Sequence, residues 1–239
     1  MNCLVDLPRR INKIGDSPAI GLSTAIGCML DLPGLPGAGN KIYDRSPYGN
    51  IGTITGAVWK RLPGGLWVLD FDGTDDYVDC GSDSSLKFTS EDFSTEFWAK
   101  FDSFASYPRI IGNDASETTG YWLDFRNTGK LRFITNQPPA ERQETNINDG
   151  LTVIDTWYHF VASRDGATVT LYRNGVDATT SHGTHIDPAT PGDTFIGRRF
   201  NVSYPMDGQI ALVRIYNRAL SALEIQNHFN REKHLFGVW

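Results

Sequence analysis

Residues 156–176 read TWYHFVASRDGATVTLYRNGV, and this stretch decides the fold class. Apolar and aromatic side chains crowd residues 157–161, the polar residues 164–166 interrupt them, and a second alternating segment begins at Val169. Two such segments joined by a turn that contains glycine predict a pair of antiparallel strands. The second strand ends at Asn174-Gly175, which favours a type I′ turn because both residues tolerate a positive φ. The stretch therefore predicts an antiparallel meander.

Further short strands, separated by polar turns, are predicted along the rest of the chain. They are expected at 28–30, 51–59, 67–71, 77–78, 93–99, 110–111, 121–125, 131–134, 194–197 and 209–216. Residues 67–78 predict a second hairpin, and residues 137–150 predict a long exposed loop. Ser221 and Glu224 form a capping box that predicts a short helix to about Phe229. Many short strands with almost no helical periodicity favour an all-β sandwich.

Several of these segments together resemble a known family. They are WYHFVA and TLYRNG in the opening stretch, YDRSPYGN at 43–50, FDGTDDYV at 71–78, FSTEFW at 93–98, DGQI at 207–210 and IYNRALS at 215–221. In this order they resemble the laminin-G-like, concanavalin-A-like lectin/glucanase jelly-roll family, roughly over residues 27–230. The resemblance implies a sandwich of two antiparallel sheets. It says little about function, because the fold carries lectins, glycosidases, adhesion modules and virion proteins.

The chain divides into a sandwich and two extensions. We predict an N-terminal arm at 1–26, the jelly roll at 27–230 and a C-terminal docking tail at 231–239. Both extensions carry apolar side chains that are expected to pack on the domain itself or on a neighbouring subunit. These candidate assembly residues are Leu4, Ile11, Ile14, Leu235, Phe236 and Trp239.

Composition excludes several classes of protein. The hydrophobic fraction of 40% excludes a disordered chain. The net charge of −6, with no Lys/Arg cluster longer than a pair, excludes a nucleic-acid partner, and no apolar run approaches the ~20 residues of a membrane span.

The first residues lack the apolar core of a secretory signal, so export is not expected. Cys3, Cys28 and Cys80 are widely spaced and odd in number, which predicts reduced, structurally passive thiols in a cytoplasm.

Catalytic chemistry finds little support in the sequence. Glycosidases of the resembled family carry E-x-D-x-x-E on a strand, and no such motif occurs here. His159 lies mid-strand among aromatic residues, where a buried histidine hydrogen-bonded across the sheet is expected rather than a base. His182 and His185 have a spacing that could contact zinc, but solvated loop histidines are the favoured interpretation. We therefore predict a protein that is not an enzyme and has no cofactor except, at most, structural calcium.

Two kinds of ligand remain candidates. The resemblance implies calcium at Asp44, Asn50 and Asp207, with turn capping by these aspartates as the alternative. The acidic turn at 72–76 could likewise bind calcium or cap its own turn. Sugar contacts are predicted from exposed aromatic and amide or arginine side chains, with core packing as the alternative for each aromatic residue. The candidate glycan contacts are Trp122, Arg198 and Tyr204, with Tyr107 and Phe200 beside them.

The resulting functional prediction is a structural or assembly module. The chain resembles proteins that decorate the capsid or form the tail of bacteriophage-like virions, which are made in the host cytoplasm and whose partners are other protein subunits. The alternative is a carbohydrate-binding lectin or adhesin that is extracellular or on a cell surface. A glycosidase is the third possibility.

Overall fold

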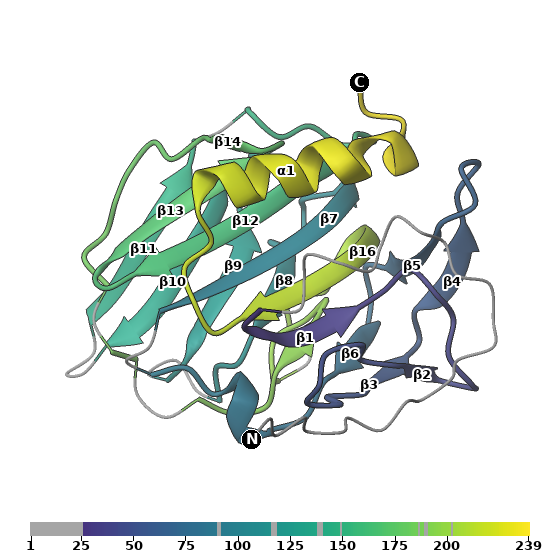
Figure 1. Ribbon diagram of the computed structural model, residues 1–239, viewed down its shortest axis with the longest axis horizontal. Helices are drawn as coiled ribbons and strands as arrows, with labels where there is room; N and C mark the ends of the chain where they lie inside the picture. Colours follow the sequence, from purple (N-terminus) through teal and green to yellow (C-terminus); the bar gives the residue numbers. More distant parts are fainter. Residues whose placement is uncertain are drawn as a thin grey trace, which may run out of the picture.

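The computed structural model describes residues 26–89, 92–115, 119–137, 141–148, 150–185, 187–188, 191–201 and 203–239. Residues 1–25 lie outside these ranges, and with them Cys3 and the candidate assembly residues Leu4, Ile11 and Ile14. Two antiparallel sheets and a C-terminal helix make up the described chain (Figure 1), so the predicted all-β jelly-roll class is confirmed. None of the helices in the described ranges has the length and apolar composition that crossing a bilayer requires.

The first sheet, sheet A, has the strand order β14-β13-β12-β7-β16-β5-β4, and β1 also pairs with β16. Its strands are β1 (Cys28–Leu32), β4 (Val58–Arg61), β5 (Trp67–Asp72), β7 (Phe93–Ser103), β12 (Tyr158–Asp165), β13 (Thr168–Arg173), β14 (Val176–Asp177) and β16 (Asp207–Tyr216). The second sheet, sheet B, has the order β11-β10-β9-β8-β15-β6-β3-β2. Its strands are β2 (Lys41–Ile42), β3 (Gly52–Thr55), β6 (Tyr77–Asp79), β8 (Arg109–Gly112), β9 (Tyr121–Phe125), β10 (Leu131–Gln137), β11 (Glu141–Ile147) and β15 (Phe195–Ile196).

The predicted meander is present in sheet A. Strands β12 and β13 pair antiparallel, and β14 follows after a turn at Asn174 and Gly175, whose φ values are 54° and 79°. Both residues therefore adopt the left-handed conformation that a type I′ turn requires. The meander joins the centre of the sheet through β12, which pairs with β7.

One predicted hairpin and one predicted strand are wrong because the chain changes sheet within each of them. Residues 67–78 form no hairpin: β5 lies in sheet A and β6 in sheet B, and the turn at 73–76 connects the two layers. Residues 51–59 form two strands rather than one, with β3 in sheet B and β4 at the edge of sheet A. Gly56, with φ of 74°, allows the chain to turn between them.

The predicted exposed loop at 137–150 is also wrong over most of its length. Residues 141–147 form β11, the edge strand of sheet B, which pairs with β10. Thr145 and Ile147 are buried, while Glu144 is partly exposed. An edge strand accepts polar outward side chains, so its composition resembles that of a loop.

Aromatic side chains fill the space between the sheets. Phe93 and Phe101 of β7 approach Tyr121 and Phe125 of β9, with 4.5 Å between ring centroids in each pair. All four residues are fully buried. Alternation along β7 places Phe97 on this inner face and Glu96 and Trp98 on the outer face of sheet A.

Helix α1 (Ala222–Glu232) covers that outer face, as the yellow ribbon across β7, β12 and β13 in Figure 1 shows. The predicted capping box is confirmed: Ser221 Oγ accepts from the Glu224 amide, and the Glu224 carboxylate accepts from the Ser221 amide. The helix is longer than predicted and continues as the 3-10 helix η2 (Lys233–Phe236). The tail therefore packs on its own domain, with Phe236 only 8% exposed and Trp239 93% exposed.

Candidate functional site

A cavity of about 310 Å³ lies on the outer face of sheet B, and we call it the arginine pocket. Its described lining residues are Tyr107, Arg109, Trp122, Asp124, Arg126, Arg132, Arg199 and Tyr204. Tyr121, Leu123 and Phe125 of β9 point into the core, so the alternate residues of that strand face the pocket. The volume is at the lower end of the range for small-molecule sites and suits a ligand of monosaccharide size.

The floor of the arginine pocket is a row of charged residues on three adjacent strands. Arg109 of β8, Asp124 of β9 and Arg132 of β10 are direct partners across the sheet. Arg132 binds Asp124 with both ends of its guanidinium group, at 2.8 Å from Nε to Oδ1 and 2.6 Å from Nη2 to Oδ2. Trp122 Nε1 donates to Asp124 Oδ2 at 3.0 Å, and the Arg109 Cζ lies 4.3 Å from the Trp122 ring centroid.

Two loops form the rim and are tied together. Tyr107 lies in the loop between β7 and β8, and Tyr204 in the loop between β15 and β16. The Ser106 hydroxyl donates to the Pro205 carbonyl at 2.7 Å, and the Arg109 amide donates to the Tyr204 carbonyl at 3.0 Å. Tyr107 and Tyr204 both have left-handed backbones, with φ of 57° and 60°. Such strain persists only where the surrounding structure holds it, and it is concentrated at ligand sites.

The structure brings some of the predicted glycan contacts together. Trp122, Tyr204 and Tyr107 line the arginine pocket. Arg198 does not line it: its guanidinium packs 3.5 Å from the Tyr77 ring centroid, and the residue is 8% exposed. Phe200 packs against Arg199 beside the pocket rather than lining it, with 4.9 Å from ring centroid to Cζ.

Five residues of the pocket were not predicted from the sequence: Arg109, Asp124, Arg126, Arg132 and Arg199. For two of these residues, Asp124 and Arg126, the sequence did contain a signal. Residues 122, 124 and 126 alternate with the core residues 121, 123 and 125, so they share one face of a strand. The contributions of β8, β10 and the 199–204 loop depend on the order of the strands in the sheet.

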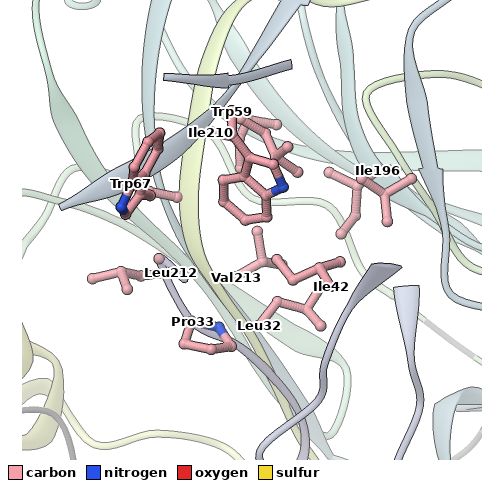
Figure 2. Close-up of a pocket in the computed structure, with 13 residues that line it drawn as sticks. Leu32, Pro33, Ile42, Trp59, Trp67, Ile196, Ile210, Leu212 and Val213 are labelled. Carbon is pink, nitrogen blue, oxygen red and sulfur yellow. The ribbon is translucent and has the colours of Figure 1, made fainter. Parts of the chain in front are cut away.

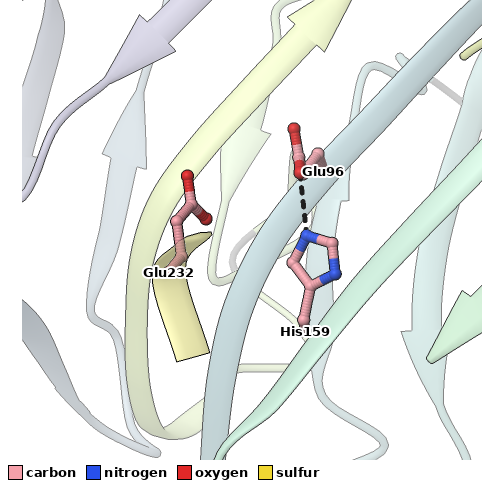
Figure 3. Close-up of side chains that lie close together, drawn as sticks. All are labelled: Glu96, His159 and Glu232. Atoms are coloured by element: carbon pink, nitrogen blue, oxygen red, sulfur yellow. Dashed lines mark hydrogen bonds and ion pairs between the residues drawn. The ribbon is translucent and has the colours of Figure 1, made fainter. Parts of the chain in front are cut away.

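A second polar cluster lies between sheet A and α1, and it is fully enclosed. Glu96 is completely buried and accepts a hydrogen bond from His159 Nε2 at 2.8 Å (Figure 3). It also accepts from Tyr216 Oη at 3.0 Å and from His228 Nδ1 at 3.0 Å. The predicted hydrogen bond of His159 across the sheet is thus confirmed. Burial would raise the pKa of Glu96, but Arg214 and the two histidines more than reverse this and hold it well below its usual range.

Arg214 links Glu96 to the helix. Its Nη1 lies 3.3 Å from Glu96 Oε2 and its Nη2 lies 2.5 Å from Glu232 Oε1. Glu96, His159 and Glu232 have ligand atoms close enough to hold a metal ion. The oxygen atoms of Glu96 already accept from three donors and form an ion pair with Arg214, so this cluster fits an ion network that fastens α1 rather than a metal centre.

The candidate calcium ligands do not converge. Both Asp44 oxygens accept hydrogen bonds, from the amides of Asp31, Ser46 and Asn50 and from the Ser46 hydroxyl. Asp44 therefore caps its own loop. Asp31, whose amide donates to Asp44, is the cross-strand partner of Arg214 near the end of β16. Asp207 begins the same strand, seven residues and roughly 20 Å from Arg214, and is therefore far from Asp44. Asp44, Asn50 and Asp207 therefore do not fit one calcium site.

Asp207 instead adjoins an acidic group at the turn between the sheets. Burial, together with Asp102, Asp72 and Asp70, raises the pKa of Asp207. In the turn itself, Asp76 Oδ2 accepts from the Asp72 amide at 2.9 Å and Asp72 Oδ1 accepts from the Thr74 amide at 2.8 Å. These carboxylates cap the turn between β5 and β6.

Comparison with known proteins places this architecture in a family. The family model of the concanavalin A-like lectin/glucanases superfamily matches residues 72–226. The chain belongs to this superfamily. A search of curated proteins gave no match.

Solved structures of the superfamily fold include bacterial toxin domains. The binding domain of Paraclostridial Mosquitocidal Protein 1 superposes with a TM-score of 0.69 at 15% identity, over 89% of this chain and 55% of that one. The receptor binding domain of botulinum neurotoxin D gives 0.65 at 16% identity over 85% and 52%, and the botulinum neurotoxin serotype G binding domain gives 0.64 at 15% over 84% and 50%. This chain thus spans about half the length of those structures, and the likeness establishes the fold.

A second, apolar cavity in this superfamily member is a gap in packing. Figure 2 shows Leu32, Ile42, Trp59, Ile196 and Val213, from strands of both sheets, around a space of about 20 Å³. That volume accommodates roughly one water molecule. We assign no ligand to it.

His185 contradicts the prediction of solvated loop histidines, although His182 is exposed. His185 is completely buried, and its two ring nitrogens each lie 2.8 Å from a threonine hydroxyl, of Thr135 and Thr145. The two hydroxyls satisfy the ring in its neutral form. Cys28 and Cys80 are free and buried.

The burial of His185 predicts a measurable acid sensitivity. Burial, and to a lesser extent Arg164, lowers the pKa of His185 to about 4. An unfolded histidine binds its proton near pH 6.5, so between pH 6.5 and 4 the unfolded chain binds more protons and stability falls as pH falls. We expect this group to remove roughly 3 kcal/mol over that interval. NMR titration of the His185 ring should give a pKa near 4, whereas a value near 6.5 would contradict this account.

Proposed function

We propose that this domain is a carbohydrate-binding module and that the arginine pocket is its sugar site. The observation that carries the proposal is the composition of the pocket. One indole, two tyrosine rings and four guanidinium groups line a single cavity of about 310 Å³. Aromatic faces pack against the C–H faces of sugars, and fixed donors read their hydroxyl groups.

The floor of the pocket supports binding rather than hydrolysis. Among its described lining residues Asp124 is the one carboxylate, and Arg132 and Trp122 already hold it. Hydrolysis of a glycoside by the usual route requires two carboxyl groups on either side of the scissile bond. We therefore propose a module that is not an enzyme, in keeping with the binding domains of similar structure.

The proposal is tested by glycan-array binding of the full chain and of a rim variant. Tyr204 is 41% exposed, so Tyr204→Ala removes a ring from the pocket without opening the core. We expect glycan binding to weaken about tenfold, the equivalent of about 1.4 kcal/mol. Tyr48→Ala is the matched control, since Tyr48 is 51% exposed and lies outside the pocket.

Two results would count against a sugar site in this pocket. One is an array that is negative for the full chain at every glycan. The other is an equal loss of binding in Tyr204→Ala and Tyr48→Ala. Thermal unfolding of both variants checks that each one is folded.

A second candidate is the assembly role in a bacteriophage-like virion, with other protein subunits as partners. Trp239 supports it, because this aromatic side chain is 93% exposed beside the anchored η2. Leu235 and Phe236 favour it less, since they pack against the cluster around Trp98. Light scattering of the full chain and of Trp239→Ser tests this role: assemblies that Trp239→Ser disrupts would support it, and a monomer in both would oppose it. The assembly role implies a location in a virion, and the carbohydrate-binding role implies a location outside the cell or on its surface.

A further inference from the structure

The arginine pocket concentrates positive charge on a protein whose net charge is −6. Four arginines line it, and its floor carries one aspartate. Arg132 pairs with that aspartate through two hydrogen bonds and also donates from Nη1 to Glu144 Oε2 at 3.1 Å, so Arg132, Asp124 and Glu144 are paired within the protein. Whether the charges of the other three arginines are balanced depends on the carboxylates near each of them.

Arg109 and Arg199 share one carboxylate beneath the floor. Arg109 Nη1 donates to Asp114 Oδ1, and Arg199 Nε donates to Asp114 Oδ2 at 3.1 Å. Arg109 is only 3% exposed, and its Nε has no hydrogen-bond partner among the described residues. Burial lowers the pKa of Arg109, although Asp114 and Asp124 act in the opposite direction. A buried donor without a partner is costly.

Arg126 adds a further charge at the mouth of the pocket. Its side chain is exposed, and its Cζ lies 5.6 Å from the Tyr107 ring centroid. In the described part of the chain it forms no ion pair. The tyrosines that flank the opening are held by hydrogen bonds between the two rim loops, so the donors and rings are positioned before a ligand arrives.

We propose that the arginine pocket binds a sugar that carries a carboxylate, with the acid group at the arginines and the ring against the tyrosine rim. This inference rests on the proposed function and narrows it to one class of ligand. Arginine suits a carboxylate because its planar guanidinium donates two parallel hydrogen bonds to the two oxygens. The mixture of aromatic rings with these donors argues for an acidic sugar over a free inorganic anion.

The test is titration calorimetry of the full chain with matched pairs of ligands. The acidic probes are methyl glucuronide, methyl galacturonide and a methyl sialoside, and each is compared with its own methyl ester, which keeps the sugar and removes the charge. We expect at least one acid to bind about tenfold or more tightly than its ester, as charge-assisted hydrogen bonds imply. Inorganic phosphate and sulfate are titrated separately, to distinguish a sugar site from a general anion site.

Variants connect the preference to the pocket. Arg126→Gln should weaken binding of the acid several-fold and leave binding of the ester unchanged, and Arg126→Lys should recover part of the loss. Arg61→Gln is the matched control, because Arg61 is also exposed and lies 6.0 Å from an aromatic ring, that of Trp67 in sheet A. It should change neither affinity.

The outcomes separate the two proposals. Equal binding of acid and ester would overturn the carboxylate inference and leave the carbohydrate module intact. Binding of phosphate or sulfate as tightly as the acidic sugars would also overturn it, in favour of an anion site. If no sugar of either kind binds and the glycan array is negative, both proposals fail.

Discussion

Replacing Glu96 by alanine is expected to lower the free energy of unfolding by about 3–5 kcal/mol, because the change removes one carboxylate partner of a buried guanidinium and the acceptor of three buried donors. Glu96 accepts from His159, Tyr216 and His228 and lies 3.3 Å from Arg214. Removal of the carboxylate takes an acceptor from three buried donors and one counter-ion from Arg214, which keeps Glu232. Urea unfolding followed by tryptophan fluorescence measures the loss.

The control for this variant is an ion pair on the surface. Lys100 Nζ lies 3.1 Å from Asp102 Oδ1, and Asp102 is exposed. Asp102→Ala should cost between 0 and about 1 kcal/mol, as exposed ion pairs do. A similar cost for Asp102→Ala and Glu96→Ala would mean that the Glu96 network contributes no more than a surface contact.

The same network predicts how stability depends on pH. The pKa of Glu96 is held well below 4.5 in the folded chain, so its contribution is complete above the unfolded pKa of about 4.5 and is lost as pH falls through the folded value. Glu96→Gln keeps the size of the side chain but has no proton to gain. We expect the variant to lose less stability than the native chain between pH 5 and pH 3, on the order of 1–2 kcal/mol, and an identical pH profile would argue against the assignment.

The second large effect is expected for Trp98→Ala, at about 3–5 kcal/mol. Trp98 is completely buried on the outer face of β7, and its ring centroid lies 4.1 Å from that of Phe236 and 5.8 Å from that of Phe229. Its Nε1 also donates to Glu232 Oε2 at 2.8 Å. The substitution therefore opens a cavity beneath α1 and η2 and removes a hydrogen bond that holds them.

Hydrogen exchange locates this effect on the molecule. Amides of α1 and η2 should lose protection in Trp98→Ala, while those of β9 and β10 in sheet B should keep most of theirs. Trp239→Ala serves as the matched control, because its side chain is 93% exposed and its loss should change stability by less than about 0.5 kcal/mol. Unchanged exchange in α1 would show that the helix is held by other contacts.

Features that depend on a few neighbouring residues were predicted correctly from the sequence. Asn174-Gly175 specified its turn because two consecutive residues must adopt positive φ, and Ser221 with Glu224 specified the start of α1 because a capping box spans four residues. The same reasoning was wrong at residues 67–78. A tight polar turn between two apolar segments looks the same whether the chain returns in one sheet or passes to the other.

The candidate site shows the same division. Tyr107, Trp122 and Tyr204 were identified as possible sugar contacts from their residue types, but nothing local distinguished them from Arg198, which packs on Tyr77. Arg109 and Arg132 meet Asp124 because β8, β9 and β10 are neighbours in register. Residues 199 and 204 join them because their loop returns from β15 to the same face.

By itself, the sequence determined the fold class, the meander at 156–176, the helix cap and the types of side chain available for a ligand. The tertiary structure alone decided which strands share a sheet, that His185 and Glu96 are enclosed, and that four arginines converge on one pocket. The physical reason is the range of the interactions. Turn and cap preferences arise within a few residues, whereas strand order, burial and the pairing of charges depend on residues up to 100 or more positions apart, such as Glu96 and Tyr216 with a separation of 120.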